Sequence, residues 1–147
     1  MLKIAIRLRK YILFRPISKL IFLIIGIDIP NQVELGKNVV FPHNSVGTVI
    51  HPNTKIGNGV KIYQNVTIGR SDIYNEFNNS NMSNIIIKDN VIICAGAKIL
   101  SKEKEFIIGE NSIVAANAVL LNSIGSNEIW AGVPAKKIGY INKKREK

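Results

Sequence analysis

The chain has 147 residues, 46% of them hydrophobic, which is enough for one domain with a real core and too few for two. Wholesale disorder is excluded, because disordered chains are poor in apolar residues. The formal net charge is +10, but six basic residues lie in the first twenty positions and six in the last twelve, so the central body is close to neutral. A nucleic-acid partner is therefore not expected, since it would need a basic face on the folded body.

The first 27 residues are basic and apolar and predict a helical cap. Their apolar residues follow helical spacing, which predicts one helix that ends before Pro16 and a second, shorter one from Ser18 to Gly26. The longest uninterrupted apolar run, Leu20 to Ile27, has eight residues, whereas a membrane span needs about 20. We expect residues 1–27 to cover the first coil of the domain and, compatibly, to lie as a basic amphipathic segment on an anionic membrane surface.

The chain contains one cysteine, Cys94. A single cysteine excludes an internal disulfide and fits a reducing compartment. The N-terminal segment also lacks a small-residue cleavage site. We therefore expect a cytoplasmic protein, with peripheral contact at the inner face of the membrane where the cap binds lipid.

From about Ile29 onward, aliphatic residues recur every six positions. The first positions of these hexads are Ile50, Ile56, Ile62 and Ile68 in one block, Ile87, Ile93 and Ile99 in a second, and Ile108, Val114 and Leu120 in a third. A period of six fits neither an α-helix nor a hairpin strand, and scattered aliphatic residues of a β-sandwich would not keep three blocks in phase. Each hexad is a short strand plus a turn, and three hexads close one triangular coil. We predict an all-β, left-handed parallel β-helix over residues 28–139, followed by a basic tail at 140–147.

Small and polar residues recur near the expected turns of this repeat. They are Gly36, Asn38, Gly57, Asn58, Asp89, Asn90, Gly109 and Asn111. We expect them to adopt backbone conformations that branched residues resist.

Three segments interrupt the six-residue rhythm: His43–Val49, Arg70–Asn84 and Ser101–Phe106. Long excursions from a rigid scaffold commonly carry function. We interpret the second, which is rich in Asn and Ser, as a loop over an active site. We interpret the third as a solvated surface bulge.

Five motifs follow one another in order: D-I-P at 28–30, F-P-H at 41–43, N-V-T-I-G at 65–69, G-A-K-I-L at 96–100 and A-G-V-P-A-K at 131–136. In this combination the chain resembles the serine O-acetyltransferase family over roughly residues 20–139. It is most similar to the shorter relatives found in bacterial capsule and lipopolysaccharide gene clusters. The resemblance implies acetyl-CoA as co-substrate, no required metal, and a homotrimer with its sites between subunits.

The family's catalytic pair is a histidine in the F-P-H position and an aspartate fifteen residues earlier, which here are His43 and Asp28. A hydroxyl that attacks a thioester needs a base, and an imidazole can take its proton and pass it to the departing thiolate. A carboxylate on the other ring nitrogen would fix the tautomer of that imidazole. The alternatives are a surface turn residue for His43 and a cap of the first coil for Asp28.

By the same resemblance, small residues let the pantetheine arm of the cofactor approach the backbone. Motif positions assign this role to Ala95, Gly96 and Ala116, although steric fit of the coil would also explain small residues there. Lys136 or Lys137 would lie near the cofactor phosphates, unless these lysines belong only to a solvated basic tail.

The acceptor is less well defined by the resemblance. Longer family members carry a substrate-contacting histidine in the loop after the T-I-G step, whereas the loop here offers Arg70, Asp72 and Tyr74 instead. His51 either contributes to the acceptor pocket or forms a plain turn. We therefore expect a sugar hydroxyl, in surface polysaccharide biosynthesis, as the leading acceptor, with serine in cysteine biosynthesis as the alternative.

Three other function classes compete with O-acetyl transfer. An amino-sugar N-acetyltransferase would use the same fold and cofactor. A zinc enzyme like the γ-type carbonic anhydrases would need three histidine ligands, and the chain has only His43 and His51. A catalytically silent scaffold would release no thiol from acetyl-CoA. Cys94 is interpreted as structural, because no histidine stands beside it in the sequence.

Overall fold

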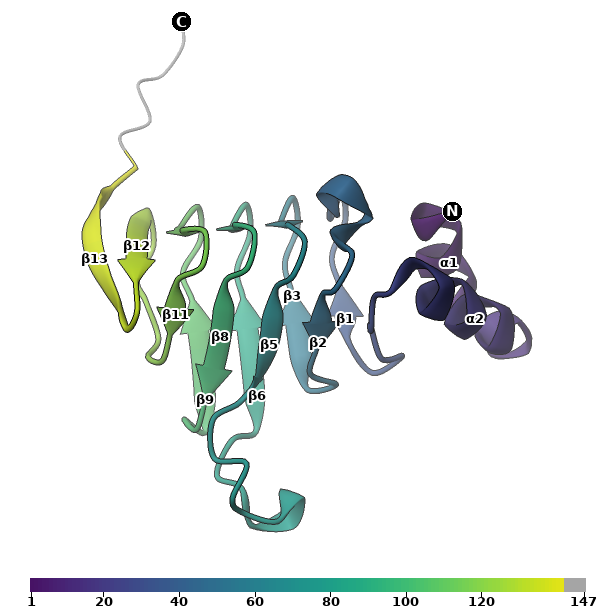
Figure 1. Ribbon diagram of the computed structural model, residues 1–147, viewed down its shortest axis with the longest axis horizontal. Helices are drawn as coiled ribbons and strands as arrows, with labels where there is room; N and C mark the ends of the chain where they lie inside the picture. Colours follow the sequence, from purple (N-terminus) through teal and green to yellow (C-terminus); the bar gives the residue numbers. More distant parts are fainter. Residues whose placement is uncertain (142–147) are drawn as a thin grey trace, which may run out of the picture.

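The computed structural model describes residues 1–141 as a triangular prism of short parallel strands with two helices at one end (Figure 1). The first face contains β2 (Val49–Ile50), β5 (Thr67–Arg70), β8 (Lys98–Ser101) and β11 (Val119–Leu120). The second contains β1 (Glu34–Leu35), β3 (Thr54–Ile56), β6 (Asn84–Ile87) and β9 (Glu105–Ile108). The third contains β4 (Lys61–Ile62), β7 (Ile92–Ile93), β10 (Ile113–Val114), β12 (Glu128–Gly132) and β13 (Ala135–Tyr140). Successive strands occupy successive faces, which confirms the predicted left-handed parallel β-helix.

The strand register stacks each hexad on its copy one coil away. Ile62 pairs with Ile93 on the third face, and Ile68 pairs with Ile99 on the first. The predicted first-position residues of the three blocks are between 0% and 4% exposed. Removal of this much aliphatic surface from water is the main favourable term in the stability of the prism.

The small and polar residues predicted for the turns fall into two groups, those with a positive φ and those without. Asn38, Asn90 and Asn111 have positive φ, as expected for left-handed turn residues. Gly36 does not; it is needed because a Cβ there would lie 2.6 Å from the backbone of Gly57 in the next coil. For Gly57 and Gly109 the reason is likewise close packing, and for Asn58 and Asp89 it is a hydrogen bond of 2.8 Å from the Asn58 N–H to the Asp89 carboxylate. The expectation of unusual backbone angles was wrong for these five residues.

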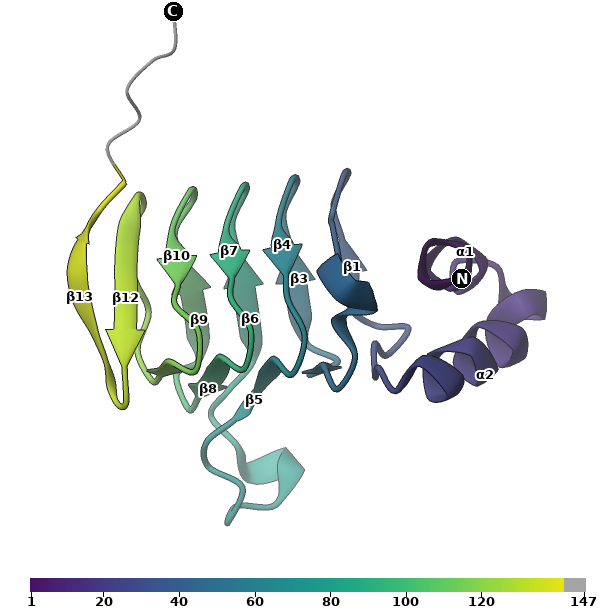
Figure 2. The same ribbon diagram turned by 45° about the horizontal axis from the view of Figure 1, so that its top comes forward.

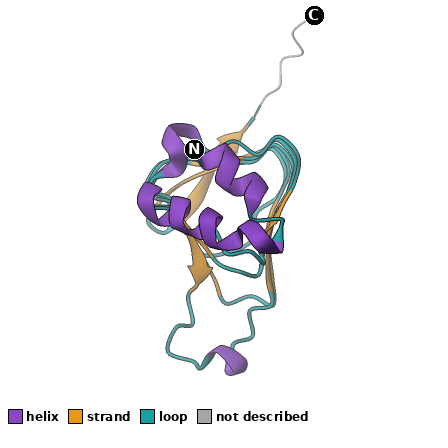
Figure 3. Cartoon of the chain, turned by 90° about the vertical axis from the view of Figure 1, so that its right-hand side faces the viewer, coloured by secondary structure: helices purple, strands orange, loops and turns teal. Residues whose placement is uncertain are grey.

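The N-terminal cap consists of α1 (Leu2–Leu8), a 3-10 turn η1 (Ile12–Phe14) and α2 (Arg15–Ile25). Pro16 lies in the first turn of α2 and does not end a helix, because a proline there loses no intrahelical hydrogen bond. The predicted second helix therefore begins three residues earlier than expected. Figure 3 shows both helices lying across the end of the prism.

Arg9 fixes the cap to the first coil. Its guanidinium donates hydrogen bonds to the carbonyl oxygens of Pro30, at 2.8 Å, and Val33. Burial lowers the pKa of this arginine. Arg9, one of the six basic residues near the N-terminus, is thus buried inside the fold. The side of α2 that carries Ser18 and Phe22 is buried as well.

The segment between β5 and β6 projects from the prism, as Figure 2 shows, and contains a short 3-10 turn, η3 (Phe77–Asn79). The bulge between β8 and β9 is shorter than predicted. Ser101 and Phe106 at its ends are fully buried, so only the residues between them project.

The far end of the prism is closed by the antiparallel hairpin of β12 and β13. The Glu128 carboxylate accepts hydrogen bonds from the Trp130 indole N–H, at 2.8 Å, and from the Lys137 ammonium, at 3.1 Å. Tyr140, the first residue of the predicted tail, is the last residue of β13, and residues 142–147 of that tail lie outside the described residues. Among residues 1–141, no helix combines the length and apolar character that crossing a membrane requires.

Candidate active site

Four of the predicted site residues lie on one edge of the prism, where the chain turns from the third face to the first. His43 lies in η2 (Pro42–Ser45), the turn that leads to β2. Ala95 and Gly96 occupy the turn between β7 and β8, and Ala116 occupies the turn between β10 and β11. We call this the β4–β2 edge, because it joins the third face, which contains β4, to the first face, which contains β2. The regular fold therefore aligns, along its axis, residues that are up to 73 positions apart in the sequence (116 − 43 = 73).

The backbone at His43 is unusual. His43, Asn44 and Ser45 have φ values of 54°, 55° and 45°, a left-handed run that costs non-glycine residues free energy. The buried Ser45 hydroxyl donates to the carbonyl of Ile62 in the next coil at 2.5 Å, which holds the turn in place. Such strain persists only where surrounding contacts enforce it, and it is concentrated at functional sites.

Two further residues of this edge were not identified from the sequence. The Tyr63 ring lies 6.3 Å from the His43 ring, centroid to centroid, with 46° between the planes. The side-chain carbonyl oxygen of Gln64 is buried and accepts no hydrogen bond from residues 1–141. Their position in the sequence, in the hexad turn one coil after His43, could have identified them as neighbours of His43. A buried acceptor without a donor invites one from a ligand or another chain.

Asp28 lies on the first face beside β2. Its backbone N–H donates to the carbonyl of Thr48 at 2.8 Å, and its carbonyl accepts from the N–H of Ile50 at 3.0 Å. Its side chain is exposed. Within the described part of this single chain, no hydrogen bond or ion pair joins the Asp28 carboxylate to His43. The catalytic pairing of these two residues remains a prediction.

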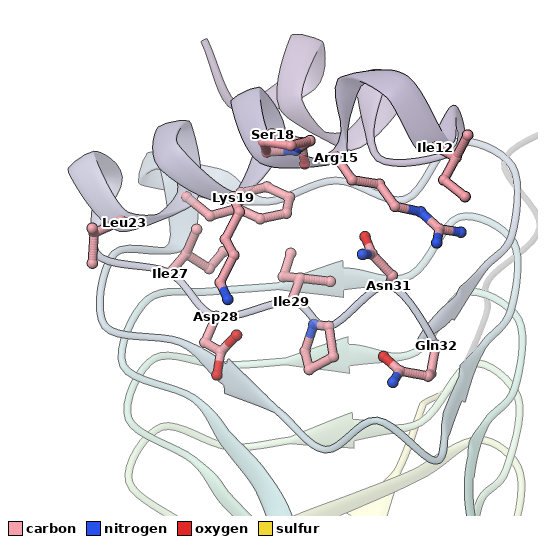
Figure 4. A pocket seen from close by; sticks show the side chains of 13 residues that line it. Ile12, Arg15, Ser18, Lys19, Leu23, Ile27, Asp28, Ile29, Asn31 and Gln32 are labelled. Carbon is pink, nitrogen blue, oxygen red and sulfur yellow. The ribbon is translucent and has the colours of Figure 1, made fainter.

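A groove of about 900 Å³ separates α2 from the first coil beside Asp28. Its floor is formed by Phe22, Ile27 and Ile29, all buried. In Figure 4, the Lys19 side chain extends from α2 toward the coil that carries Asp28. The groove thus combines an apolar floor with charges of both signs on its walls, and no sequence pattern predicted it.

Arg70 and Asp72, predicted as acceptor contacts, hold the projecting loop together. The Arg70 Nε lies 3.7 Å from the Asp72 carboxylate, which also accepts a 2.8 Å hydrogen bond from the Ser80 hydroxyl. The bond from Ser80 lowers the pKa of Asp72. Asp72 is only 3% exposed, so it is inaccessible to an acceptor in this conformation, whereas Tyr74 is 80% exposed.

His51 lies at the end of β2, half-buried. Its Nδ1 accepts a 3.2 Å hydrogen bond from the N–H of Asn53, which is a local turn interaction. Burial, and then the positive charge of Arg70, lower the pKa of His51. The imidazole is therefore neutral at physiological pH.

The two predicted phosphate-binding lysines differ in availability. The Lys137 ammonium lies 3.1 Å from the Glu128 carboxylate and 2.9 Å from the Tyr140 hydroxyl. Those partners, Tyr140 first, raise the pKa of Lys137. Lys136 is exposed, and its role toward a phosphate remains a prediction.

Cys94, the single cysteine of the chain, is half-buried. Burial raises the pKa of the Cys94 thiol, which disfavours the reactive thiolate. No group of three or more His, Cys, Asp or Glu side chains among residues 1–141 is arranged to hold a metal ion.

Comparison with known proteins identifies the class of this fold and edge. No family model matches the chain. It is 35% identical over 126 residues to the serine acetyltransferase of Staphylococcus xylosus, covering 86% of this chain and 54% of that protein. The crystal structure of serine acetyltransferase from Brucella abortus strain S19 matches with a TM-score of 0.70 and 30% identity, over 88% of this chain and 48% of the other. The same enzyme in complex with coenzyme A matches with a TM-score of 0.69 and 30% identity, over 88% and 47%.

These matches define a hexapeptide-repeat transferase fold. More narrowly, the chain has the sequence pattern and structure of the serine O-acetyltransferase-like acyltransferases. It spans about half the length of the relatives that it matches.

Proposed function

We propose that this protein is an acetyl-CoA-dependent O-acetyltransferase in which His43 is the general base and Asp28 orients it. The observation that carries the proposal is the match to serine acetyltransferases over more than four fifths of the chain, one of them solved with coenzyme A. The strained turn at His43 and its exposure on the β4–β2 edge support the assignment.

The proposed reaction is a direct transfer through one tetrahedral intermediate. His43 accepts the proton of the acceptor hydroxyl while that oxygen attacks the thioester carbonyl. The intermediate collapses by cleavage of the carbon–sulfur bond, and the imidazolium returns the proton to the coenzyme A thiolate. Asp28 would accept a hydrogen bond from the other ring nitrogen and stabilise the imidazolium.

The cofactor would lie along the β4–β2 edge. The side chains there are small enough to let a ligand approach the backbone at Ala95, Gly96 and Ala116. A Cβ at Gly96 would lie 2.0 Å from the Asn117 side-chain oxygen. The buried carbonyl of Gln64 could then accept a hydrogen bond from a pantetheine amide, and exposed Lys136 would meet the phosphates. Small residues at this edge serve packing and cofactor approach together.

The comparisons favour serine as the acceptor over the sugar expected from the sequence. The curated relative and the two solved structures quoted above are all named serine acetyltransferase, and none carries a polysaccharide function in its name. One specific observation keeps a sugar hydroxyl as the second candidate: the projecting loop has no histidine, and its Arg70 and Asp72 are bonded to the loop itself.

The decisive experiment is a thiol-release screen of the purified protein. Acetyl-CoA is supplied with serine, with a panel of sugars and with amino sugars, and free thiol is measured. Release with serine alone supports the leading proposal, and release with sugars alone would replace serine by the second candidate. N-acetylated products would establish the amino-sugar alternative, and no release with any acceptor would leave the scaffold interpretation.

We also propose a homotrimer, because a cofactor that lies along an outer edge of a narrow prism needs a neighbouring subunit to enclose it. A cytoplasmic location, peripheral at the inner face of the membrane, is proposed as well. The single reduced cysteine and the basic, apolar surface of residues 1–27 support that location.

A further inference from the structure

We propose that the outward surface of α2 and the adjoining turn η1 docks on a bilayer that contains anionic phospholipid. We call this surface the cap face; it consists of Leu13, Ile17, Leu20 and Ile24. The inference deepens the proposed peripheral location, on which it rests, and it is independent of acetyl transfer.

The two sides of α2 differ sharply in burial. Leu13, Ile17, Leu20 and Ile24 follow each other at intervals of four, three and four residues, which places them on one side of a helix. Their exposed fractions are 79%, 49%, 57% and 66%, and Leu23 beside them is 77% exposed. The opposite side, with Ser18 and Phe22, packs on the prism. A contiguous apolar stripe of this kind in water indicates a binding surface.

The segment that carries the cap face, residues 1–27, has positive side chains and no negative ones. Lys3, Arg7, Lys10, Arg15 and Lys19 are exposed, and residues 1–27 contain no acidic side chain. The first carboxylate in the sequence is that of Asp28, on the coil side of the groove below α2. An apolar stripe flanked by cations complements a surface of acyl chains and negative headgroups.

This charge pattern favours lipid over a second copy of the same surface. Two cap faces brought together would bring two cation-rich segments close to each other, without a carboxylate from residues 1–27 of either copy. The shape agrees with this choice, because the helices lie across the end of the prism and no strand extends past them (Figures 1 and 3). A flat membrane can therefore approach the cap face along the prism axis.

The test measures sedimentation of the full-length protein with phosphatidylcholine vesicles, with and without phosphatidylglycerol. We expect binding to the anionic vesicles that weakens at high salt. Ile17→Ser with Ile24→Ser should weaken it at least about tenfold, because both side chains enter the acyl region. Lys3→Gln with Lys10→Gln should weaken it by about fivefold for each cation.

Matched variants make the result specific to the cap face. Val133→Ser with Ile138→Ser removes two exposed apolar residues, 72% and 67% exposed, at the far end of the prism. Lys143→Gln with Lys144→Gln removes the same charge from the other end of the sequence. Both pairs should bind vesicles nearly as well as the parent. Each variant is checked for an unchanged melting curve and for thiol release.

Three results would overturn the proposal. The first is no binding of the folded parent protein to anionic vesicles. The second is loss of binding in the Lys143/Lys144 pair but not in the Ile17/Ile24 pair, which would assign the contact to the tail. The third is a smaller assembly for the Ile17/Ile24 pair in lipid-free sedimentation velocity, which would show that a second copy covers the face. Failure of thiol release with normal lipid binding would count only against acetyl transfer.

Discussion

At the scale of single residues, the turn around His43 carries the most information. Its three left-handed residues have no glycine to relieve them. The buried hydroxyl of Ser45 anchors the turn to the next coil. The structure thus maintains a costly backbone conformation where the proposed base is presented to solvent.

We predict that His43→Ala removes nearly all acetyl transfer while the assembly and the melting temperature stay unchanged, because an exposed imidazole contributes little packing. The measurement is thiol release under saturating acetyl-CoA, with His51→Ala as the matched control. The control should keep its turnover number and at most change the KM for the acceptor. Near-normal turnover of His43→Ala would eliminate this residue as the base.

Asp28→Asn should cause a smaller loss of turnover and a changed pH dependence, because the amide keeps the shape but removes the charge that would stabilise the imidazolium. The full pH profile of turnover is measured for both proteins. Identical profiles and rates would show that Asp28 only closes the first coil. The backbone hydrogen bonds of Asp28 to Thr48 and Ile50 are unaffected by this change.

At the scale of elements, the projecting loop between β5 and β6 depends on one buried carboxylate. Asp72→Asn should loosen this loop, since it removes the ion pair with Arg70 and takes the charge from the acceptor of the Ser80 hydrogen bond. Limited chymotrypsin digestion at neutral pH should then cut faster at Tyr74, which is exposed. Glu76→Gln, an exposed acid in the same loop, is the control and should leave the rate unchanged. Equal rates in all three proteins would contradict the proposed anchor.

The same carboxylate gives the loop a pH dependence. Because the folded pKa of Asp72 is lowered by the Ser80 hydroxyl, its stabilising effect is complete above the ordinary aspartate value of about 4. It is lost as the pH falls through the lowered pKa. The protection of the amides of residues 71–83 against hydrogen exchange, relative to the unfolded chain at the same pH, should therefore fall in acid in the parent and much less in Asp72→Asn.

We predict that substitutions in the coils lower the free energy of unfolding strongly only at positions whose side chains point inward. Ile93→Ala should lower the free energy of unfolding by about 2–5 kcal/mol, because this side chain is fully buried between Ile62 and its neighbours. Ile92→Ala, one residue away and facing outward, should cost clearly less. Denaturant unfolding measures both, and equal losses would contradict the stacked core.

Much of this element-level organisation could be predicted from the sequence, for a simple reason. The hexad period directly records which side chains point inward, so the strands and their stacking followed from Ile50 to Leu120. The N-terminal helices were located less well, because Pro16 permits two interpretations, a break or a first turn. The hexad turn that holds Tyr63 next to His43 could have been located from the repeat, whereas the groove under α2 depends on how the cap packs on the first coil, which no local pattern encodes.

At the scale of the whole molecule, a site on an outer edge requires a neighbour. We predict a trimer in sedimentation velocity at micromolar concentration, since the β4–β2 edge alone cannot enclose a cofactor. Acetyl-CoA should stabilise this assembly and raise its melting temperature, because ligand binding to the native state adds to stability. A monomer that still releases thiol would show that the site is complete within one chain.

The parallel register along the prism also sets how this molecule can change in length. Glycines such as Gly36 and Gly109 leave no space between adjacent coils, so a single residue inserted within a regular hexad, and not in a projecting loop, would displace the side chains that follow it from their rows. Insertion of eighteen residues, one complete circuit, would instead lengthen the prism by about 4.8 Å and return each row to alignment. The distance from the helical end to the terminal hairpin can therefore change only by a whole number of coils.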